Sequence, residues 1–158
     1  MSIRYRLYFS GFSIVEILVV VAIVVTLAGI ALLGLAHMRD RLSLDDAAGA
    51  MVFHLEESKA RAVAGHGGVS HGIRFADDSY SQFAGSAYDE NDDSNVLHEL
   101  DPRLRLTTDI LGDEPAVVFS RITGAADESV TLTIGLRRDP DTRRVIVIGP
   151  GGDISYGE

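Results

Sequence analysis

One apolar segment constrains this chain more than any other feature. Residues 12–36 (FSIVEILVVVAIVVTLAGIALLGLA) contain a single charged side chain, that of Glu16. About 20 apolar residues suffice for a helix to cross a bilayer, so we expect residues 12–36 to form a transmembrane helix. Arg4 and Arg6 precede it, and positive charge stays on the cytoplasmic side, which places the rest of the chain outside. A cleaved secretory signal is the alternative, but its apolar region spans only about 7 to 15 residues.

The rest of the chain has the opposite character. The 158 residues carry 23 acidic and 14 basic side chains, a formal net charge of −9, yet the mean hydropathy is +0.16. Such an acidic balance disfavours sequence-independent nucleic-acid binding. The absence of cysteine excludes disulfides, thiolate metal sites and thiol catalysis. The length allows one domain of about 100 to 150 residues after the helix.

Glu16 is the anomaly of the apolar segment. A carboxylate at the hydrocarbon centre costs about 2.5 kcal/mol or more and usually has a partner. Glu16 lies five residues after Gly11. If the chain is cut between Gly11 and Phe12, the new amino group lies near the helix N-terminus, where Glu16 of a neighbouring copy can neutralise it. A buried ion pair of this kind would fix the axial register between subunits.

These residues resemble the leader of type IV pilins and type II secretion pseudopilins: a short basic peptide, a Gly11–Phe12 junction, Glu16 and a long apolar helix. The resemblance implies that a prepilin peptidase cuts after Gly11 and N-methylates Phe12. It also implies that Glu16 meets the N-terminal amine of the adjacent subunit. Loss of the leader takes the formal net charge to −11. One departure is the absence of proline from the apolar segment, since the first proline is Pro102.

Four segments follow from the patterns along the chain. Residues 1–11 are the leader, residues 12–36 the transmembrane and filament-core helix, residues 37–65 its amphipathic continuation, and residues 66–158 an extracytoplasmic β-rich domain. The continuation has an apolar stripe at helical spacing, formed by Leu44, Ala48, Met51, Leu55 and Ala62. The glycines at 65, 67 and 68 end it.

The last segment is predicted to contain mainly antiparallel strands. Apolar and polar residues alternate, or β-formers cluster, at 69–75, 80–83, 103–108, 116–121, 130–136 and 144–148, with a short strand near 154. The predicted fold class is α+β, a long N-terminal helix packed on an antiparallel β-sheet domain, as in pilins.

Patterns in the second half resemble the minor pseudopilin H of type II secretion systems and related type IV minor pilins. They include the helix end at 56–62, Val118–Phe119 with Gly124, and Ile146–Ile148 before Gly152. The resemblance implies a structural subunit in the bacterial inner membrane and then in a pseudopilus or pilus. Its implied partners are other pilins or pseudopilins, the prepilin peptidase, the inner-membrane assembly platform and membrane lipid. A different pilin type is the competing interpretation.

An acidic stretch supplies the one cofactor prediction, a calcium ion. Its ligand candidates alternate along the chain like the first positions of an EF-hand loop: Asp89, Asn91, Asp93 and Asn95. The match then fails, because Ser94 stands in place of the turn glycine and Leu100 in place of the last acid. A solvated loop is the competing interpretation.

The basic cluster after the leader flanks a turn predicted at 139–142 and consists of Arg137, Arg138, Arg143 and Arg144. Because some related minor pilins bind DNA, the resemblance raises the alternative of a pilus-tip subunit that contacts DNA or a surface. Asp139 and Asp141 offset part of this charge, and a salt-bridged hairpin that keeps a sheet edge soluble is the competing interpretation.

Catalytic chemistry has little support in the sequence. His66 and His71 lack a third nearby histidine or cysteine for a zinc site. There is no Gly-x-Ser-x-Gly motif or phosphate loop. An anchored enzyme would need neither the Gly11 junction nor Glu16, so the chain is predicted not to be an enzyme.

Overall fold

The structure, a computed structural model, describes residues 13–112 and 115–157, without the side chains of residues 31–34, 36 and 37. The predicted cleavage site at Gly11 and Phe12 therefore lies outside the described residues. The chain divides into two compact units, Met1–Met38 and Arg39–Glu158. Helix α1 (Ile14–Val63) contributes residues to both units.

The described side chains of the first unit are apolar on every side of the helix. Its large aliphatic residues between Ile14 and Leu35 are 52–78% exposed where they are described. The Thr26 hydroxyl donates to the Ala22 carbonyl oxygen at 2.8 Å, so this polar group is satisfied within the helix. Among the residues that the structure describes, no helix combines the length and hydropathy needed to cross a membrane.

The predicted stripe on the second half of α1 is confirmed. Its five members are all completely buried: Leu44, Ala48, Met51, Leu55 and Ala62. Ser58, which is 2% exposed, fills the remaining position of the stripe and was not predicted. The helix ends as expected, because Gly65 adopts a left-handed φ of 65° and leads into the short 3-10 helix η1 (His66–Gly68).

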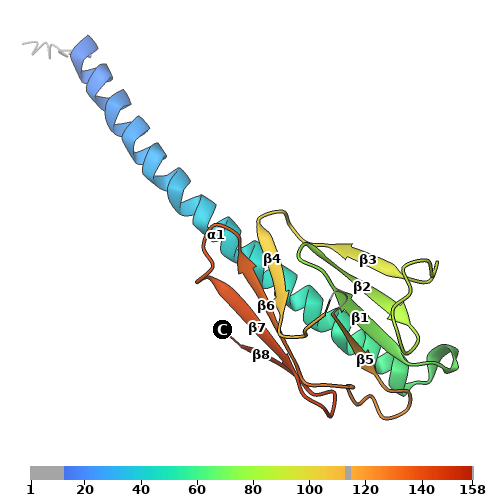
Figure 1. Ribbon diagram of the computed structural model, residues 1–158. Helices are drawn as coiled ribbons and strands as arrows, with labels where there is room; N and C mark the ends of the chain where they lie inside the picture. The colour runs from blue at the N-terminus through green and yellow to red at the C-terminus, as the bar shows by residue number, and fades with distance from the viewer. Residues whose placement is uncertain (1–12, 113–114, 158) are drawn as a thin grey trace, which may run out of the picture. The chain divides into compact units, whose positions relative to one another are not determined.

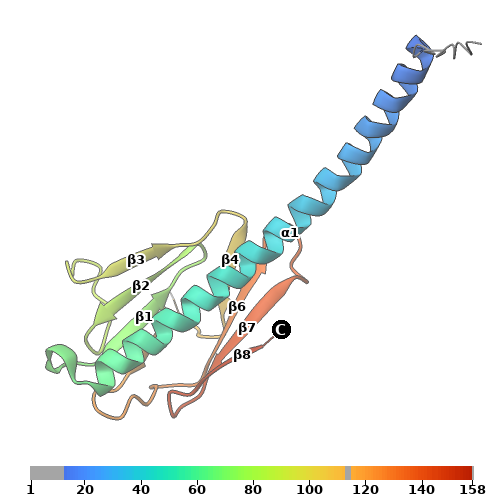
Figure 2. The same cartoon turned by 180° about the vertical axis from the view of Figure 1, so that it is seen from behind.

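In the described part of the second unit (Arg39–Glu158), which we call the head, eight antiparallel strands follow the helix. The strands are β1 (His71–Phe75), β2 (Ser79–Ala84), β3 (Val96–Glu99), β4 (Leu104–Thr108), β5 (Ala116–Phe119), β6 (Val130–Leu136), β7 (Arg143–Ile148) and β8 (Ile154–Gly157). They form two four-stranded sheets, in the orders β3-β2-β1-β5 and β4-β6-β7-β8. The part of α1 within the head crosses one face of both sheets (Figures 1 and 2).

The core lies between α1 and the two sheets. Strand β6 shows how the sequence builds it, since Val130, Leu132 and Ile134 are completely buried while Thr131 and Thr133 between them are not. Sheet β3-β2-β1-β5 contributes Phe75 and Phe119, two of the largest buried side chains. The alternation predicted for residues 130–136 is therefore confirmed, and its buried side chains face the helix.

Ion pairs fasten α1 to the strands where the head begins. Arg103 contacts Asp40 of α1 at 2.5 Å and Asp101 at 2.7 Å. Hydrogen bonds from Arg103 hold the pKa of Asp101 well below its usual range. Arg144 of β7 donates from Nε to Asp45 of α1 at 2.9 Å. These groups are partly exposed, so each pair adds little stability but restrains the angle between helix and strands.

The sheet organisation differs from the sequence prediction in two details. The strands form two sheets, because β4 pairs with β6 over Leu104–Leu136 to Thr108–Leu132 and not with β1 or β5. Strand β3 was not predicted, because its burial pattern lacks the apolar-polar alternation of a half-buried strand.

Candidate functional site

The first turn of α1 holds the most informative charge of the sequence, Glu16. The Val15 amide donates to Ser13 Oγ at 3.3 Å, which makes Ser13 the N-cap residue. Glu16 is then the third helical residue, where a capping box carries its acid and where the helix dipole favours negative charge. The position of Glu16 is therefore compatible with a role in capping the helix as well as with the predicted role in subunit register.

The predicted calcium ligands are only partly brought together. Asp89 Oδ1 accepts a hydrogen bond from the Asn91 amide at 3.0 Å, and Asn95 Nδ2 donates to the Asp89 carbonyl oxygen at 2.7 Å. These bonds close a turn and occupy one carboxylate oxygen. Among the described residues, no hydrogen bond joins Asp93 to the other three, although Asn95 Oδ1 is buried without a partner. Calcium binding stays a prediction.

The four arginines flank a hairpin between β6 and β7, as the sequence predicts. They differ in their contacts and exposure. Asp139 accepts a hydrogen bond from the Thr142 hydroxyl at 2.6 Å, and the Leu136 amide donates to the Thr142 carbonyl oxygen at 3.2 Å. Arg144 is half-buried against Asp45, while the other three arginines are exposed. DNA contact at Arg137, Arg138 and Arg143 stays a prediction, and Arg144 contacts the helix.

One hydrogen bond joins the two histidines near the helix end. His71 Nε2 hydrogen-bonds to the His66 carbonyl oxygen at 3.1 Å, and their rings lie 6.0 Å apart. Within the described ranges, no group of three His, Cys, Asp or Glu side chains is placed to hold a metal ion.

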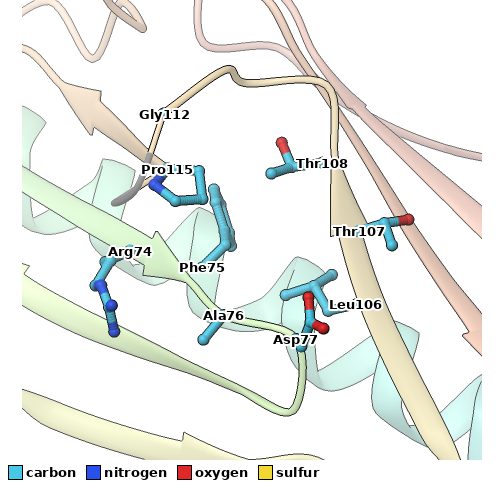
Figure 3. A pocket seen from close by; sticks show the side chains of 9 residues that line it. All are labelled: Arg74, Phe75, Ala76, Asp77, Leu106, Thr107, Thr108, Gly112 and Pro115. Atoms are coloured by element: carbon cyan, nitrogen blue, oxygen red, sulfur yellow. The ribbon is translucent and has the colours of Figure 1, made fainter.

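A cavity of about 410 Å³ lies between the end of β1 and β4 (Figure 3). Phe75, Leu106, Thr107 and Thr108 contribute to its lining. Asp77, the carboxylate of the described lining, is paired with Arg105 at 3.0 Å. Arg74 points away from the threonines in Figure 3.

A polar cluster between α1 and sheet β3-β2-β1-β5 was missed by sequence reasoning. The rings of His54 and His98 stack with centroids 4.0 Å apart, and Tyr80 stacks on His98 at 5.1 Å. His54 Nδ1 lies 2.9 Å from the Tyr80 hydroxyl. Gln82 accepts from His98 Nε2 at 3.1 Å and donates to Ser58 and Glu57. The cluster had no sequence signal because His98 lies in the unpredicted strand β3.

This cluster should make the head sensitive to mild acid. Burial lowers the pKa of His98, and the charge of His54 lowers it further, whereas Glu57 raises it. A folded pKa below the unfolded value of 6.5 means that unfolding takes up a proton. The free energy of unfolding is therefore expected to fall as the pH drops below 6.5 and to level off below the folded pKa. Glu57 is itself paired with Arg61 at 2.7 Å.

Urea unfolding of the full chain in a mild detergent at about pH 7.5 and about pH 5.5 measures this effect. His98→Gln removes the half-buried titrating group, and this variant should lose less stability between the two pH values than the unmodified chain. His66→Gln, at an exposed histidine, serves as the control. An equal pH dependence in all three proteins would contradict the expected role of His98.

Comparison with known proteins settles the fold. No family model matches the sequence, and no curated protein gives a significant sequence match. The type IV minor pilin FimU of Pseudomonas aeruginosa aligns with a TM-score of 0.60 and 17% identity, over 75% of this chain and 91% of FimU. The minor pseudopilin EpsH from the Type 2 Secretion System of Vibrio cholerae aligns with a TM-score of 0.57 and 16% identity, over 73% of this chain and 96% of EpsH.

The chain has a pilin-like fold. This confirms the predicted α+β class and the resemblance on which it rests. Glu16 therefore lies in the first turn of the apolar N-terminal helix of a pilin-like fold. Processing, partners and the roles of the individual site residues stay predictions.

Proposed function

We propose that this chain is a structural subunit, of the minor pseudopilin or minor pilin type, that assembles into a filament through its N-terminal helix. The observation that carries the proposal is the apolar surface around α1 from Ile14 to Ile30, interrupted by one carboxylate in the first turn. A helix that is apolar on every side needs a membrane or a bundle of helices around it. Filament-core packing supplies such a bundle.

The proposal includes the order of events before assembly. The subunit inserts in the inner membrane with its N-terminus in the cytoplasm and its head outside, as Arg4 and Arg6 favour. The prepilin peptidase then cuts after Gly11 and methylates Phe12. The assembly platform moves the helix from lipid into the filament, where each Glu16 neutralises the terminal amine of a neighbour.

Similarity to both EpsH and FimU leaves two machines within the proposal, a secretion pseudopilus that supports protein export and a type IV pilus. DNA contact by a pilus-tip subunit remains the alternative function, through the exposed Arg137, Arg138 and Arg143. No catalytic role is proposed.

Mass spectrometry of the native protein tests the processing step. In cells with an active prepilin peptidase, the mature chain is expected to begin at Phe12 and to carry one added methyl group. The same gene expressed in cells without the peptidase is the control and should give a chain that retains the leader. An intact N-terminus in the presence of the active peptidase would contradict the proposed function.

A further inference from the structure

A strained and exposed side chain marks one end of the head. Ile122 has a φ of 74° and is, among the described residues, the one non-glycine with positive φ. A β-branched residue is sterically disfavoured in this left-handed region, and strain of this kind gathers where a surface has a function. Burial does not explain the choice of isoleucine, because its side chain is 66% exposed.

Neighbouring backbone holds Ile122 in this position. Its amide donates to the Ala62 carbonyl oxygen at the end of α1, at 3.0 Å. A Cβ placed on Gly124 would lie 2.6 Å from Val63 Cγ2, and a Cβ on Gly152 would lie 2.0 Å from the Gly124 carbonyl oxygen. The loop after β5 thus lies tightly between the helix end and the turn before β8 (Figures 1 and 2). Ile122 is presented on a rigid support.

The surroundings of Ile122 are apolar and positively charged. Val63 is 47% exposed, and the aliphatic stem of Lys59 lies against Gly124, since Lys59 Cγ would be 3.3 Å from a Cβ there. Arg121 is the residue before Ile122, and neither basic side chain forms an ion pair among the described residues. We call Lys59, Val63, Arg121 and Ile122 the Ile122 tip. It is a basic spot on a chain of net charge −9.

The head also carries the complementary surface. The loop before β3 exposes four carboxylates that form no ion pair in the described structure: Asp89, Glu90, Asp92 and Asp93. Beside them in β3, Leu97 is 61% exposed. We call residues 89–93 with Leu97 the acidic patch. The acidic patch combines exposed apolar surface with negative charge. The Ile122 tip combines exposed apolar surface with positive charge.

We propose that the Ile122 tip of one copy docks on the acidic patch of a second copy of this chain. Charge complementarity selects the partner and the orientation, while Ile122 and Val63 supply the apolar contact. The two surfaces are different, so the contact is heterologous and leaves one of each open on the pair, which permits repetition along an assembly. The contact goes beyond the proposed function, which concerns the N-terminal helices, because it joins heads.

The chain contains one lysine, Lys59, which makes a sharp test available. A water-soluble carbodiimide joins a carboxylate to an amine without a spacer. The full chain is purified in a mild detergent as an equal mixture of unlabelled and ¹⁵N-labelled protein, and covalent dimers are digested and analysed by mass spectrometry. Mixed-isotope peptides are expected to link Lys59 to residues 89–93. Their yield should fall between about 0.1 M and about 1 M salt, where the screening length drops from about 10 Å to about 3 Å.

Two variants separate the tip from general association. Ile122→Gly keeps the left-handed backbone conformation and removes the apolar contact, so the yield of this link is expected to fall about tenfold, as for loss of one buried aliphatic side chain. Leu111→Gly removes a side chain that is 98% exposed outside both surfaces and should leave the yield unchanged. Absence of the link, links from Lys59 mainly to other carboxylates, or an unchanged yield in Ile122→Gly would each overturn the proposal.

The same digest tests the head contact and the proposed helix contact separately. In the chain processed after Gly11, the other amine is that of Phe12, so a link from it to Glu16 of another copy reports the contact between helices. A link at Lys59 without one at Glu16 would support the head contact alone, and the reverse would support the helix contact alone.

Discussion

Replacement of Glu16 with Ala is expected to leave the head folded and the chain in the membrane, yet to reduce incorporation into filaments by at least about a hundredfold. Removing one partner of a buried ion pair strands the other charge, which costs about 3–5 kcal/mol. In the proposed filament the stranded charge is the terminal amine of the neighbouring subunit. The effect is measured by comparing the variant in sheared filaments with the variant that remains in the membrane fraction.

The position of Glu16 in the helix demands a second variant. Because Ser13 caps α1 and Glu16 is the third helical residue, Ala also removes a group suited to the capping box. Glu16→Gln retains a capping side chain but has no charge to neutralise an amine. If the ion pair fixes the register, Gln should fail as Ala does. Normal incorporation of Glu16→Gln together with failure of Glu16→Ala would assign Glu16 to the cap and refute the register role.

Side-chain periodicity explains why most of the fold could be predicted. Leu44, Met51 and Leu55 recur at helical spacing, and one buried face of the helix is enough to generate that pattern. Strand β6 alternates because one face meets the helix and the other meets solvent. Both signals are local, so each is visible in a short stretch of sequence.

The features that were missed depend on contacts between distant residues. The division into two sheets depends on Leu104 pairing with Leu136, and alternation alone does not select a partner strand. His54 meets His98 through the unpredicted strand β3. The contact of Arg144 with Asp45 joins residues 99 positions apart. Such contacts follow from packing of the whole head, which leaves no mark in the sequence near either residue.

The same distinction between local sequence patterns and long-range structure applies to the candidate sites. Glu16 was identified from sequence because a single charge within an apolar segment is conspicuous without a structure. Ile122 was not, since its significance comes from a backbone angle of 74° that no neighbouring residue type announces. The usual sequence marker of a left-handed position is glycine or asparagine, and here isoleucine occupies it.

The second large effect is expected at the buried stripe of α1. Leu55 is completely buried between the helix and the sheets, and Leu55→Ala should lower the free energy of unfolding of the head by about 2–5 kcal/mol, through lost burial and the cavity left behind. Domains of this kind have about 5–15 kcal/mol in total. Urea unfolding of the full chain in a mild detergent, followed by the near-ultraviolet dichroism of the head tyrosines, measures the change.

Phe53 provides the matched control two positions earlier on the same helix. It is the larger side chain, but it is 63% exposed, so Phe53→Ala should change the free energy of unfolding by no more than about 0.5 kcal/mol. Side-chain size alone would rank the two substitutions in the opposite order, whereas the direction of the buried face predicts a far larger loss for Leu55→Ala than for Phe53→Ala. Equal losses in the two variants would mean that the helix does not pack on the sheets through the stripe of Leu44, Met51 and Leu55. The head would then lack the core that positions its two surfaces.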